Sequence, residues 1–236
     1  MSAYDAFAAI YDDWAAHMTE DVPFYVEVAR ESEGPIVELA VGSGRVAVPV
    51  ARATGRTVIG FDSSPAMLAL ARVRAAAAGV DLDLREADMR DLQLDEPADL
   101  VYCPFRSLLH LPGWADRRRV FERVAGSLRP GGRFAWNAFV FDPHFAASND
   151  GYAARHGKLW EYVEHAPADN RIDVTAFVDQ PGFEPRTVSL WWCTRSEWQA
   201  LLDVAGLETE ALYGWFDRRP FDDHAREFVW VARKPL

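Results

Sequence analysis

The sequence predicts a doubly wound α/β fold, a mainly parallel sheet with helices on both faces. Two observations carry this prediction: apolar strands alternate with helices from Pro35 to Val140, and strands then follow one another without helices. Alternating strands and helices form parallel sheets, whereas strands joined by short turns pair antiparallel. We therefore expect one domain over residues 1–236, with an N-terminal helical cap at 1–33 and an inserted flap at 141–193.

The cap is predicted from helical periodicity. Apolar residues recur at steps of three and four, which places them on one stripe of a helix. A second short helix is expected from Pro23 to Arg30. The stripe consists of Tyr4, Phe7, Ala8, Tyr11, Trp14, Ala15 and Met18.

The alternating segment supplies five strands, and two more come near the end of the chain. Ser64 followed by Pro65 begins a helix that Gly79 ends. Thr194 and Glu197 form a capping box for a later helix. A third helix is expected over Trp114–Leu128. The strands are Ile36–Ala40, Thr57–Phe61, Asp81–Arg85, Ala98–Tyr102, Arg133–Val140, Glu208–Tyr213 and Glu227–Val231.

The flap is expected to contain three antiparallel strands, Leu159–Glu164, Arg171–Val178 and Arg186–Cys193. Alternation in the last strand gives it two faces. An apolar face is expected to pack on the main domain, and the other face, which includes Trp191, borders either solvent or an acceptor pocket. The apolar face comprises Val188, Leu190 and Trp192.

Composition restricts the partners. The chain has 25 Lys and Arg against 36 Asp and Glu, a formal charge of -11. Such a chain repels polyphosphates, so we expect no nucleic-acid partner. Two cysteines are too few for a disulfide framework, and neither a signal peptide nor a membrane span is visible. We therefore expect a cytoplasmic protein without a membrane partner; a homodimer is left open.

A glycine-containing turn marks the predicted cofactor site. The segment Glu38–Arg45 follows the first strand, where open α/β sheets bind ligands at their carboxyl edge. Asp62 lies twenty residues after Gly42, at the tip of the second strand, where a carboxylate can accept both ribose hydroxyls of an adenosine. Gly42, Gly44 and Ala47 also satisfy the dinucleotide pattern, so the turn alone leaves two cofactor classes open.

Further segments resemble class I methyltransferases, Rossmann-like enzymes that use S-adenosylmethionine. Val58–Leu68 is similar to their second motif, and Glu86–Arg90 to their third. The resemblance implies a seven-stranded sheet with an antiparallel final strand. Ala40 departs from it, because most members have glycine there. The implied cofactor-binding residues are Tyr11, Glu38, Ala40, Gly42, Gly44, Arg45, Asp62, Ser63, Met67, Asp88, Met89 and Cys103.

Within that class, the chain looks most like sugar-amine N,N-dimethyltransferases and glycine N-methyltransferases. The helical N-terminus with Tyr4 and Tyr11, Ala40 and the inserted flap carry this likeness. It implies that Tyr11 closes over the cofactor and takes part in catalysis. A core aromatic on the helical stripe is the alternative for Tyr11.

The segment after the fourth strand narrows the chemistry. Cys103-Pro104-Phe105-Arg106 lacks the Asn/Asp-Pro-Pro-Tyr/Phe signature of enzymes that methylate adenine or glutamine amides. It also lacks the aspartate that metal-dependent catechol enzymes place there. We therefore expect no metal site, and methyl transfer to a nitrogen or oxygen of a small-molecule acceptor.

His110 is the first candidate for a catalytic base, because it lies beyond the fourth strand; the alternative is a packing histidine. Arg106 either holds an acidic group of the acceptor or is a solvated loop residue. His144, Trp160 and Trp191 complete the predicted acceptor-binding residues, with His144 as a weaker alternative base.

Two rival functions remain open from the sequence. The first is a nicotinamide-dependent oxidoreductase on the same sheet, since the dinucleotide pattern is met. The third motif and the absence of a Tyr-x-x-x-Lys pair speak against it. The second is a protein that binds S-adenosylmethionine without catalysis.

Overall fold

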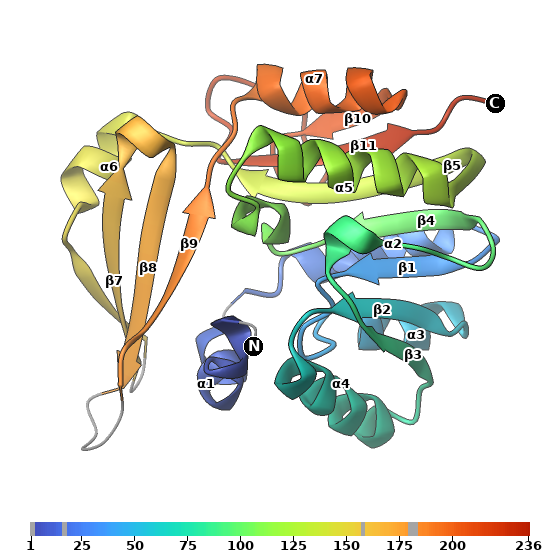
Figure 1. The fold of residues 1–236 in the computed structure, drawn as a ribbon, viewed down its shortest axis with the longest axis horizontal. Helices are drawn as coiled ribbons and strands as arrows, with labels where there is room; N and C mark the ends of the chain where they lie inside the picture. The colour runs from blue at the N-terminus through green and yellow to red at the C-terminus, as the bar shows by residue number, and fades with distance from the viewer. Residues whose placement is uncertain (1–2, 16–17, 157–158, 179–183) are drawn as a thin grey trace.

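The central element is a seven-stranded sheet with the strand order β10-β11-β5-β4-β1-β2-β3. The computed structural model describes residues 3–15, 18–156, 159–178 and 184–236 (Figure 1). Strand β11 runs antiparallel to both neighbours and the other pairs are parallel, which confirms the predicted topology. The strands are β1 (Ile36–Leu39), β2 (Val58–Asp62), β3 (Leu82–Glu86), β4 (Ala98–Cys103), β5 (Leu128–Phe139), β10 (Glu208–Tyr213) and β11 (Glu227–Arg233).

The order of these strands creates a switch point between β1 and β4. The chain proceeds outward from β1 through β2 to β3, and then returns to the other side of β1 as β4. At such a point the following loops separate and leave a crevice at the carboxyl ends of the strands. The predicted cofactor turn after β1 lies at this place.

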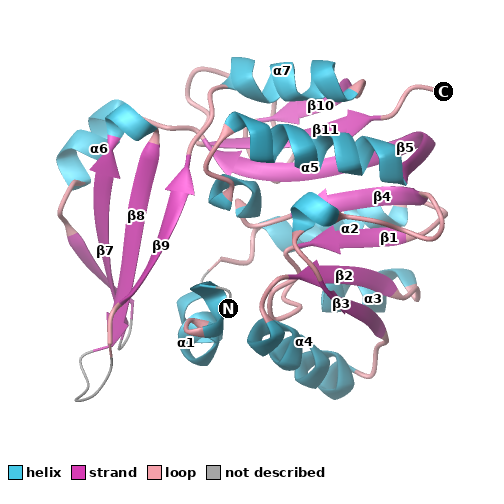
Figure 2. Ribbon diagram, viewed as in Figure 1, coloured by secondary structure: helices cyan, strands magenta, loops and turns pink. Residues whose placement is uncertain are grey.

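Helices cover both faces of the sheet, as a doubly wound fold requires (Figure 2). Successive residues of a strand point to opposite faces. Val37 packs with α5 and α7 in one core, whereas Ile36 packs with α2 and α3 in the other. The helices are α2 (Asp21–Arg30), α3 (Ala47–Thr54), α4 (Pro65–Ala78), α5 (Trp114–Ser127) and α7 (Arg195–Ala205).

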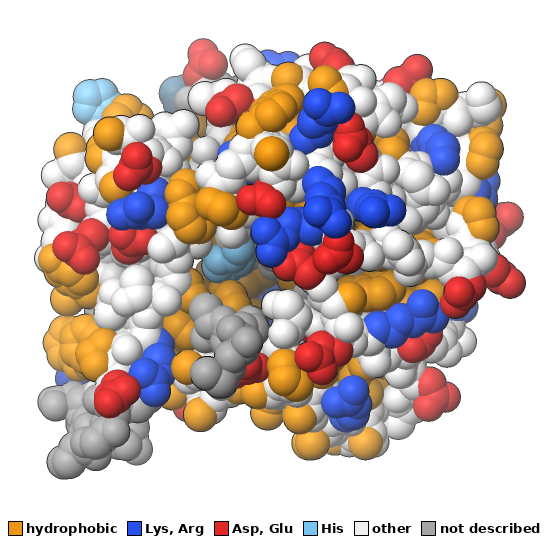
Figure 3. Space-filling view, in the orientation of Figure 1, with side chains coloured by type: hydrophobic (Ala, Val, Ile, Leu, Met, Phe, Trp, Pro, Cys, Tyr) orange, Lys and Arg blue, Asp and Glu red, His pale blue; other side chains and the backbone are white. Residues whose placement is uncertain are grey.

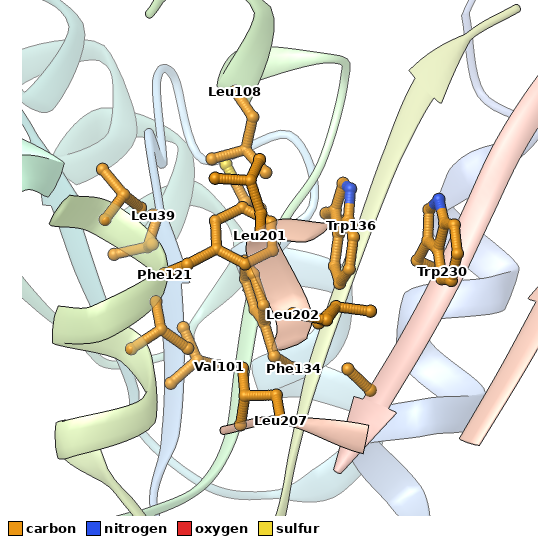
Figure 4. Packing of buried hydrophobic residues seen from close by; sticks show 14 of the residues in the cluster. Leu39, Val101, Leu108, Phe121, Phe134, Trp136, Leu201, Leu202, Leu207 and Trp230 are labelled. Carbon is orange, nitrogen blue, oxygen red and sulfur yellow. The ribbon is translucent and has the colours of Figure 1, made fainter. Parts of the chain in front are cut away.

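The core beneath α5 and α7 is rich in aromatic rings (Figure 4). Trp136 on β5 and Trp230 on β11 lie parallel, with 5.6 Å between ring centroids, and Phe121 of α5 meets Trp136 edge-on at 5.1 Å. Fully buried rings of this kind contribute more than their area alone. This core fixes the positions of β4 and β5, whose carboxyl ends border the crevice.

The helix boundaries follow the predicted caps. The Ser64 side chain accepts a hydrogen bond from the backbone N–H of Met67, and Gly79 ends α4 in the left-handed conformation. Thr194 and Glu197 form the capping box of α7. Strand β5 begins earlier than predicted, because Leu128 already pairs with Ala98 across a register shift.

The N-terminal cap is not the single long helix that its periodicity predicted. A 3₁₀ turn, η1 (Ala3–Asp5), precedes a short helix, α1 (Ala8–Ala15). The Asp5 carboxylate accepts a hydrogen bond from the Ser64 hydroxyl at 2.6 Å, and this contact ties η1 to the start of α4. Residues 16 and 17 of the predicted helix lie outside the described residues. In Figure 1, α1 stands between the flap and α4.

The flap has four strands instead of the predicted three. The additional edge strand, β6, pairs with β7 from Ala153↔Tyr162 to His156↔Leu159. Its four residues are too few to show the alternation of a strand. The flap comprises β6 (Ala153–His156), β7 (Leu159–Ala166), β8 (Arg171–Val178) and β9 (Arg186–Trp191), in that order, after the short helix α6 (Pro143–Asn149).

On the apolar face predicted for the last flap strand, Val188 and Trp192 are buried and Leu190 is half-buried. Val188 packs with Phe7 of the cap, so this residue meets the cap instead of the main sheet. Leu190 reaches the sheet core, and the Trp192 ring stacks on Phe141 with 3.7 Å between centroids.

In the part of the chain that the structure describes, no helix combines the length and the apolarity needed to cross a bilayer.

Candidate active site

A cavity of about 550 Å³ lies at the switch point. The turns after β1 and β2 form one wall, and the cap, the 3₁₀ turn η3 (Ser107–His110) and strand β9 of the flap form the opposite wall. Figure 3 shows the molecular face on which the flap and the main sheet meet around a hollow. The predicted residues in its lining are Tyr11, Ala40, Gly42, Asp62, Ser63, Met67, Asp88, Met89, His110 and Trp191.

The carboxylate of Asp62 lies on the first wall and is held by backbone N–H groups from two turns, one after β1 and one after β2. Its Oδ2 accepts the N–H of Gly42 at 2.8 Å, and its Oδ1 accepts the N–H of Ser64 at 2.8 Å. Burial raises the pKa of this carboxyl group above its usual value, although the backbone donors oppose the shift. Each carboxylate oxygen can accept more than one hydrogen bond, so both can still receive hydroxyl groups from the cavity.

Gly42 leaves the wall open where a ligand would approach. Its φ of 55° is in the left-handed region that favours glycine. A Cβ at this position would meet Met67 Cε at 3.4 Å and the Tyr11 hydroxyl at 3.7 Å, and would fill the space between the turn and the cap. The absence of a side chain therefore keeps room for a ligand beside Asp62.

The third motif borders the cavity with Asp88 and Met89. The Asp88 carboxylate accepts two hydrogen bonds from the Arg90 guanidinium, at 3.0 and 2.6 Å. These bonds hold the pKa of Asp88 below its usual value. Arg90 is bound in turn by Asp116 at 3.0 Å. The side chain of Asp88 is thus fixed in place and negatively charged.

Four predicted cofactor-binding residues lie behind the wall instead of on it. Glu38 is buried and accepts a hydrogen bond from the Tyr102 hydroxyl at 2.7 Å, and burial holds its pKa well above the usual value. Arg45 forms a bidentate pair with Asp21, with both N···O distances 2.6 Å. Gly44 has a left-handed φ of 78° and Cys103 is a core residue. These residues shape the turn from beneath.

His110 is joined to Tyr4, which was not among the predicted site residues. The Tyr4 hydroxyl lies 2.8 Å from His110 Nε2, and His110 Nδ1 lies 3.2 Å from the backbone carbonyl oxygen of Ser189. A carbonyl oxygen can only accept, so Nδ1 carries the hydrogen and Nε2 accepts from Tyr4. Burial lowers the pKa of His110 to about 4, which keeps the ring neutral at pH 7.

Tyr4 was predicted as a member of the helical stripe and as part of the N-terminal likeness to sugar-amine and glycine N-methyltransferases, without a role in the site. It lies seven residues before Tyr11, so both rings were expected on one face, and they meet at 6.1 Å in an edge arrangement. Burial raises the pKa of both hydroxyl groups well above the usual value, so both are neutral donors. Only the contact with His110, 106 residues away, distinguishes Tyr4 from a packing ring.

Three predicted acceptor-binding residues, Arg106, His144 and Trp160, lie outside this cavity. Arg106 turns away and forms a bidentate pair with Glu227, at 3.1 and 2.8 Å. Trp160 stacks on Phe177 within the flap. His144 is exposed on α6. Neighbouring positions on a strand or in a loop can face different cavities, and sequence order does not reveal which.

Among the residues that the structure describes, no three His, Cys, Asp or Glu side chains are grouped as potential metal ligands. The acidic residues at the cavity, Asp62 and Asp88, are engaged by backbone N–H groups and by Arg90.

Comparison with known proteins points to one family. Residues 36–132 match the methyltransferase domain. The chain is 30% identical to the dTDP-3-amino-3,6-dideoxy-alpha-D-glucopyranose N,N-dimethyltransferase of Streptomyces fradiae over 192 residues, which cover 76% of this chain and 72% of that protein.

Solved structures agree with this assignment. The CcbJ methyltransferase from Streptomyces caelestis is 26% identical, with a TM-score of 0.86 over 100% of this chain and 99% of that chain. CalS10, an amino pentose methyltransferase from Micromonospora echinaspora solved with S-adenosylmethionine bound, is 26% identical, with a TM-score of 0.66 over 99% and 92%. The nicotinamide-dependent and the non-catalytic alternatives are thereby set aside. The chain belongs to the class I S-adenosylmethionine-dependent methyltransferases and is an enzyme that uses S-adenosylmethionine.

Proposed function

We propose that this enzyme transfers a methyl group to an oxygen or nitrogen atom of a small-molecule acceptor, without a metal ion. The observation that carries the proposal is the pairing of Tyr4 with His110 on the wall opposite Asp62, within one cavity. The name of the Streptomyces fradiae relative places its reaction on a dTDP-linked amino sugar, and this supports a small-molecule acceptor here.

The first wall fits the cofactor. The carboxylate of Asp62 would hold the ribose hydroxyls, and the glycine turn at Gly42 would receive the aminoacyl part. Met67 and Met89 supply apolar surface for the adenine ring, with the fixed carboxylate of Asp88 beside it. Bound S-adenosylmethionine supplies an electrophilic methyl group that leaves its sulfonium by in-line displacement.

The opposite wall positions the acceptor and removes its proton. As the new bond to the methyl carbon forms, the acceptor O–H or N–H proton moves to Tyr4 Oη, and the proton of Tyr4 moves to His110 Nε2. The hydrogen bond from His110 Nδ1 to Ser189 keeps Nε2 directed at Tyr4 throughout. With a pKa of about 4, the resulting imidazolium readily returns its proton to water. Positioning contributes most of the acceleration, because the displacement itself requires only close alignment.

Isotope transfer tests this proposal. The enzyme is incubated with methyl-labelled S-adenosylmethionine and a metabolite extract of the source cells, and labelled products are identified by mass spectrometry. We expect the label in a small molecule, and a labelling rate at least a hundredfold lower for His110→Ala at equal cofactor occupancy. Label in the macromolecular fraction, or no label although the cofactor binds, would contradict the proposal.

A further inference from the structure

A second cavity, of about 690 Å³, lies on the other side of β9. Ser189 and Trp191 face the first cavity, whereas Leu190 between them faces the second. The inner face of the flap forms one side of the second cavity, and the end of β5 with α6 forms the other. This volume is within the range of sites that hold a drug-sized molecule.

The lining of the second cavity is mainly apolar and aromatic. Phe139 and Phe141 come from the end of β5, and Val174 comes from the flap. At the border of the cavity, Phe145 and Tyr152 remain 63% and 62% exposed. Large apolar side chains gathered at a cavity in this way are typical of a binding site and not of an ordinary solvated surface.

The charges of the lining disfavour a site for phosphate groups. Arg106 is neutralised by Glu227, which is fully buried, and Arg226 is neutralised by Asp142. Among the described lining residues, both arginines are thus paired, and Glu161 adds a further carboxylate, whose charge acts on Arg106. Arg106 and Arg226 are balanced by Asp142 and Glu161 in the lining, and the buried Glu227 behind Arg106 adds one further negative charge, so an anion entering this cavity would meet an excess negative charge.

Glu161 also gives the cavity a polar anchor. Its Oε2 accepts a hydrogen bond from the Trp14 indole N–H at 2.7 Å. A carboxylate has about four acceptor positions, so it can receive further N–H or O–H groups from a ligand. At the other end of the same strand, His165 pairs with Asp150 at 3.2 Å. His165 lies four positions after Glu161, so the lining extends roughly 13 Å along β7.

The two cavities are separated by an unusual turn. Phe105 borders the first cavity and Arg106 the second, and both have left-handed φ angles, 60° and 63°. Such backbone conformations cost about 1 kcal/mol or more in a residue other than glycine, and they cluster at functional sites. Here the turn directs consecutive side chains to opposite cavities.

We propose that the second cavity binds the non-reacting, ring-bearing part of an acceptor that is uncharged or cationic. A cavity of about 550 Å³ is of the size that holds one ligand, so the cofactor leaves room there for little more than the reacting group. The body of the acceptor then lies against Phe139 and Phe141, with an N–H or O–H group directed to Glu161. A nucleotide diphosphate is disfavoured in the cavity. The identity of the occupant as the acceptor rests on the proposed function.

A matched pair of fluorescent probes tests the site itself. N-phenyl-1-naphthylamine is uncharged, and 8-anilino-1-naphthalenesulfonate carries the same rings with an added sulfonate. We expect saturable binding of the uncharged probe, at least tenfold tighter than binding of the sulfonate, and unchanged by saturating S-adenosylhomocysteine. Equal affinity for both probes, or displacement of the uncharged probe by S-adenosylhomocysteine, would overturn the proposal.

Two substitutions on β6 locate the probe. Ala154→Phe fills the cavity from its edge strand, and Ala153→Phe adds the same ring on the opposite face of that strand. Ala154→Phe should weaken binding of the uncharged probe at least tenfold, and Ala153→Phe should change it less than twofold. Glu161→Gln should reduce the difference in affinity between the uncharged probe and the sulfonate. If Ala154→Phe and Ala153→Phe weaken binding of the uncharged probe equally, the probe does not bind in the second cavity.

The acceptor recovered by isotope transfer completes the test. It should displace the uncharged probe, and Ala154→Phe should raise the acceptor KM while kcat changes less than twofold. If the probe results hold but no small molecule is methylated, the proposed function fails and the binding site stands. If methylation occurs and the acceptor does not displace the probe, the occupancy proposed here is wrong.

Discussion

The two walls of the first cavity are built differently. On the cofactor wall, the backbone N–H groups of Gly42 and Ser64 hold the carboxylate of Asp62. Both groups belong to short turns that follow strands, so local structure fixes this carboxylate. On the opposite wall, Tyr4, His110 and Ser189 come from the cap, η3 and the flap, and two side-chain hydrogen bonds join them. From this difference we expect that cofactor binding and proton removal can be altered separately.

The largest expected effect belongs to the opposite wall. His110→Ala should lower the rate of methyl transfer by about 10²–10⁴, as expected when proton transfer is lost. The measurement is single-turnover kinetics with the recovered acceptor. Tyr4→Phe is the matched variant, because it keeps the ring and removes only the hydroxyl group. Near-normal rates in both variants would show that alignment alone drives the reaction.

The protonation of His110 has a consequence for stability. Its pKa is about 4 in the folded protein and about 6.5 in an unfolded chain. Between these pH values the unfolded chain binds a proton that the native state does not. The free energy of unfolding should therefore fall as the pH drops from 6.5 to 4, by up to about 3 kcal/mol. Urea unfolding at several pH values measures this fall in the free energy of unfolding.

His110→Gln is the control, because it removes this titration and keeps a polar side chain of similar size. The difference in stability between wild type and variant should shrink as the pH falls through this window. A difference that stays constant from pH 7 to pH 4 would mean that His110 titrates normally.

On the cofactor wall, Asp62→Ala should weaken binding of S-adenosylhomocysteine by about ten- to a hundredfold. The estimate corresponds to losing about 1.5–3 kcal/mol of hydrogen bonding to a charged acceptor. Because Asp62 also accepts two backbone N–H groups, thermal unfolding and circular dichroism must be recorded with the affinity. Unchanged affinity in a folded variant would place the ribose elsewhere.

Trp191→Ala should produce a smaller effect. The ring borders the first cavity from the flap, so its loss should raise the acceptor KM by about two- to tenfold. Cofactor affinity should change less than twofold, because the ring is not part of the cofactor wall. If neither the acceptor KM nor the melting temperature changes, Trp191 takes no part in binding.

The last prediction is that removal of metal ions has no effect on turnover. Turnover should continue in EDTA, since the acidic residues at the cavity are engaged by protein groups and not arranged around an ion. Loss of activity that magnesium restores would require a metal-assisted reaction instead.

The sequence revealed the cofactor wall better than the opposite wall. Turns, caps and strand ends are local features, so the positions of Asp62 and Gly42 follow from their order along the chain. The Tyr4–His110 contact joins residues 106 positions apart, and Arg106 is drawn to Glu227, 121 positions away. The first contact depends on how the cap packs on the main domain, and the second on how the loop after β4 meets β11; hydrophobic periodicity specifies neither. The same limit hid the short edge strand β6.

The division between the two walls is tested most directly by calorimetric titration of S-adenosylhomocysteine into wild type, Asp62→Ala and His110→Ala under the same conditions. The account predicts that only Asp62→Ala loses affinity, by about ten- to a hundredfold, and that His110→Ala stays within twofold of wild type. Equal losses in both variants, or no loss in Asp62→Ala, would contradict it.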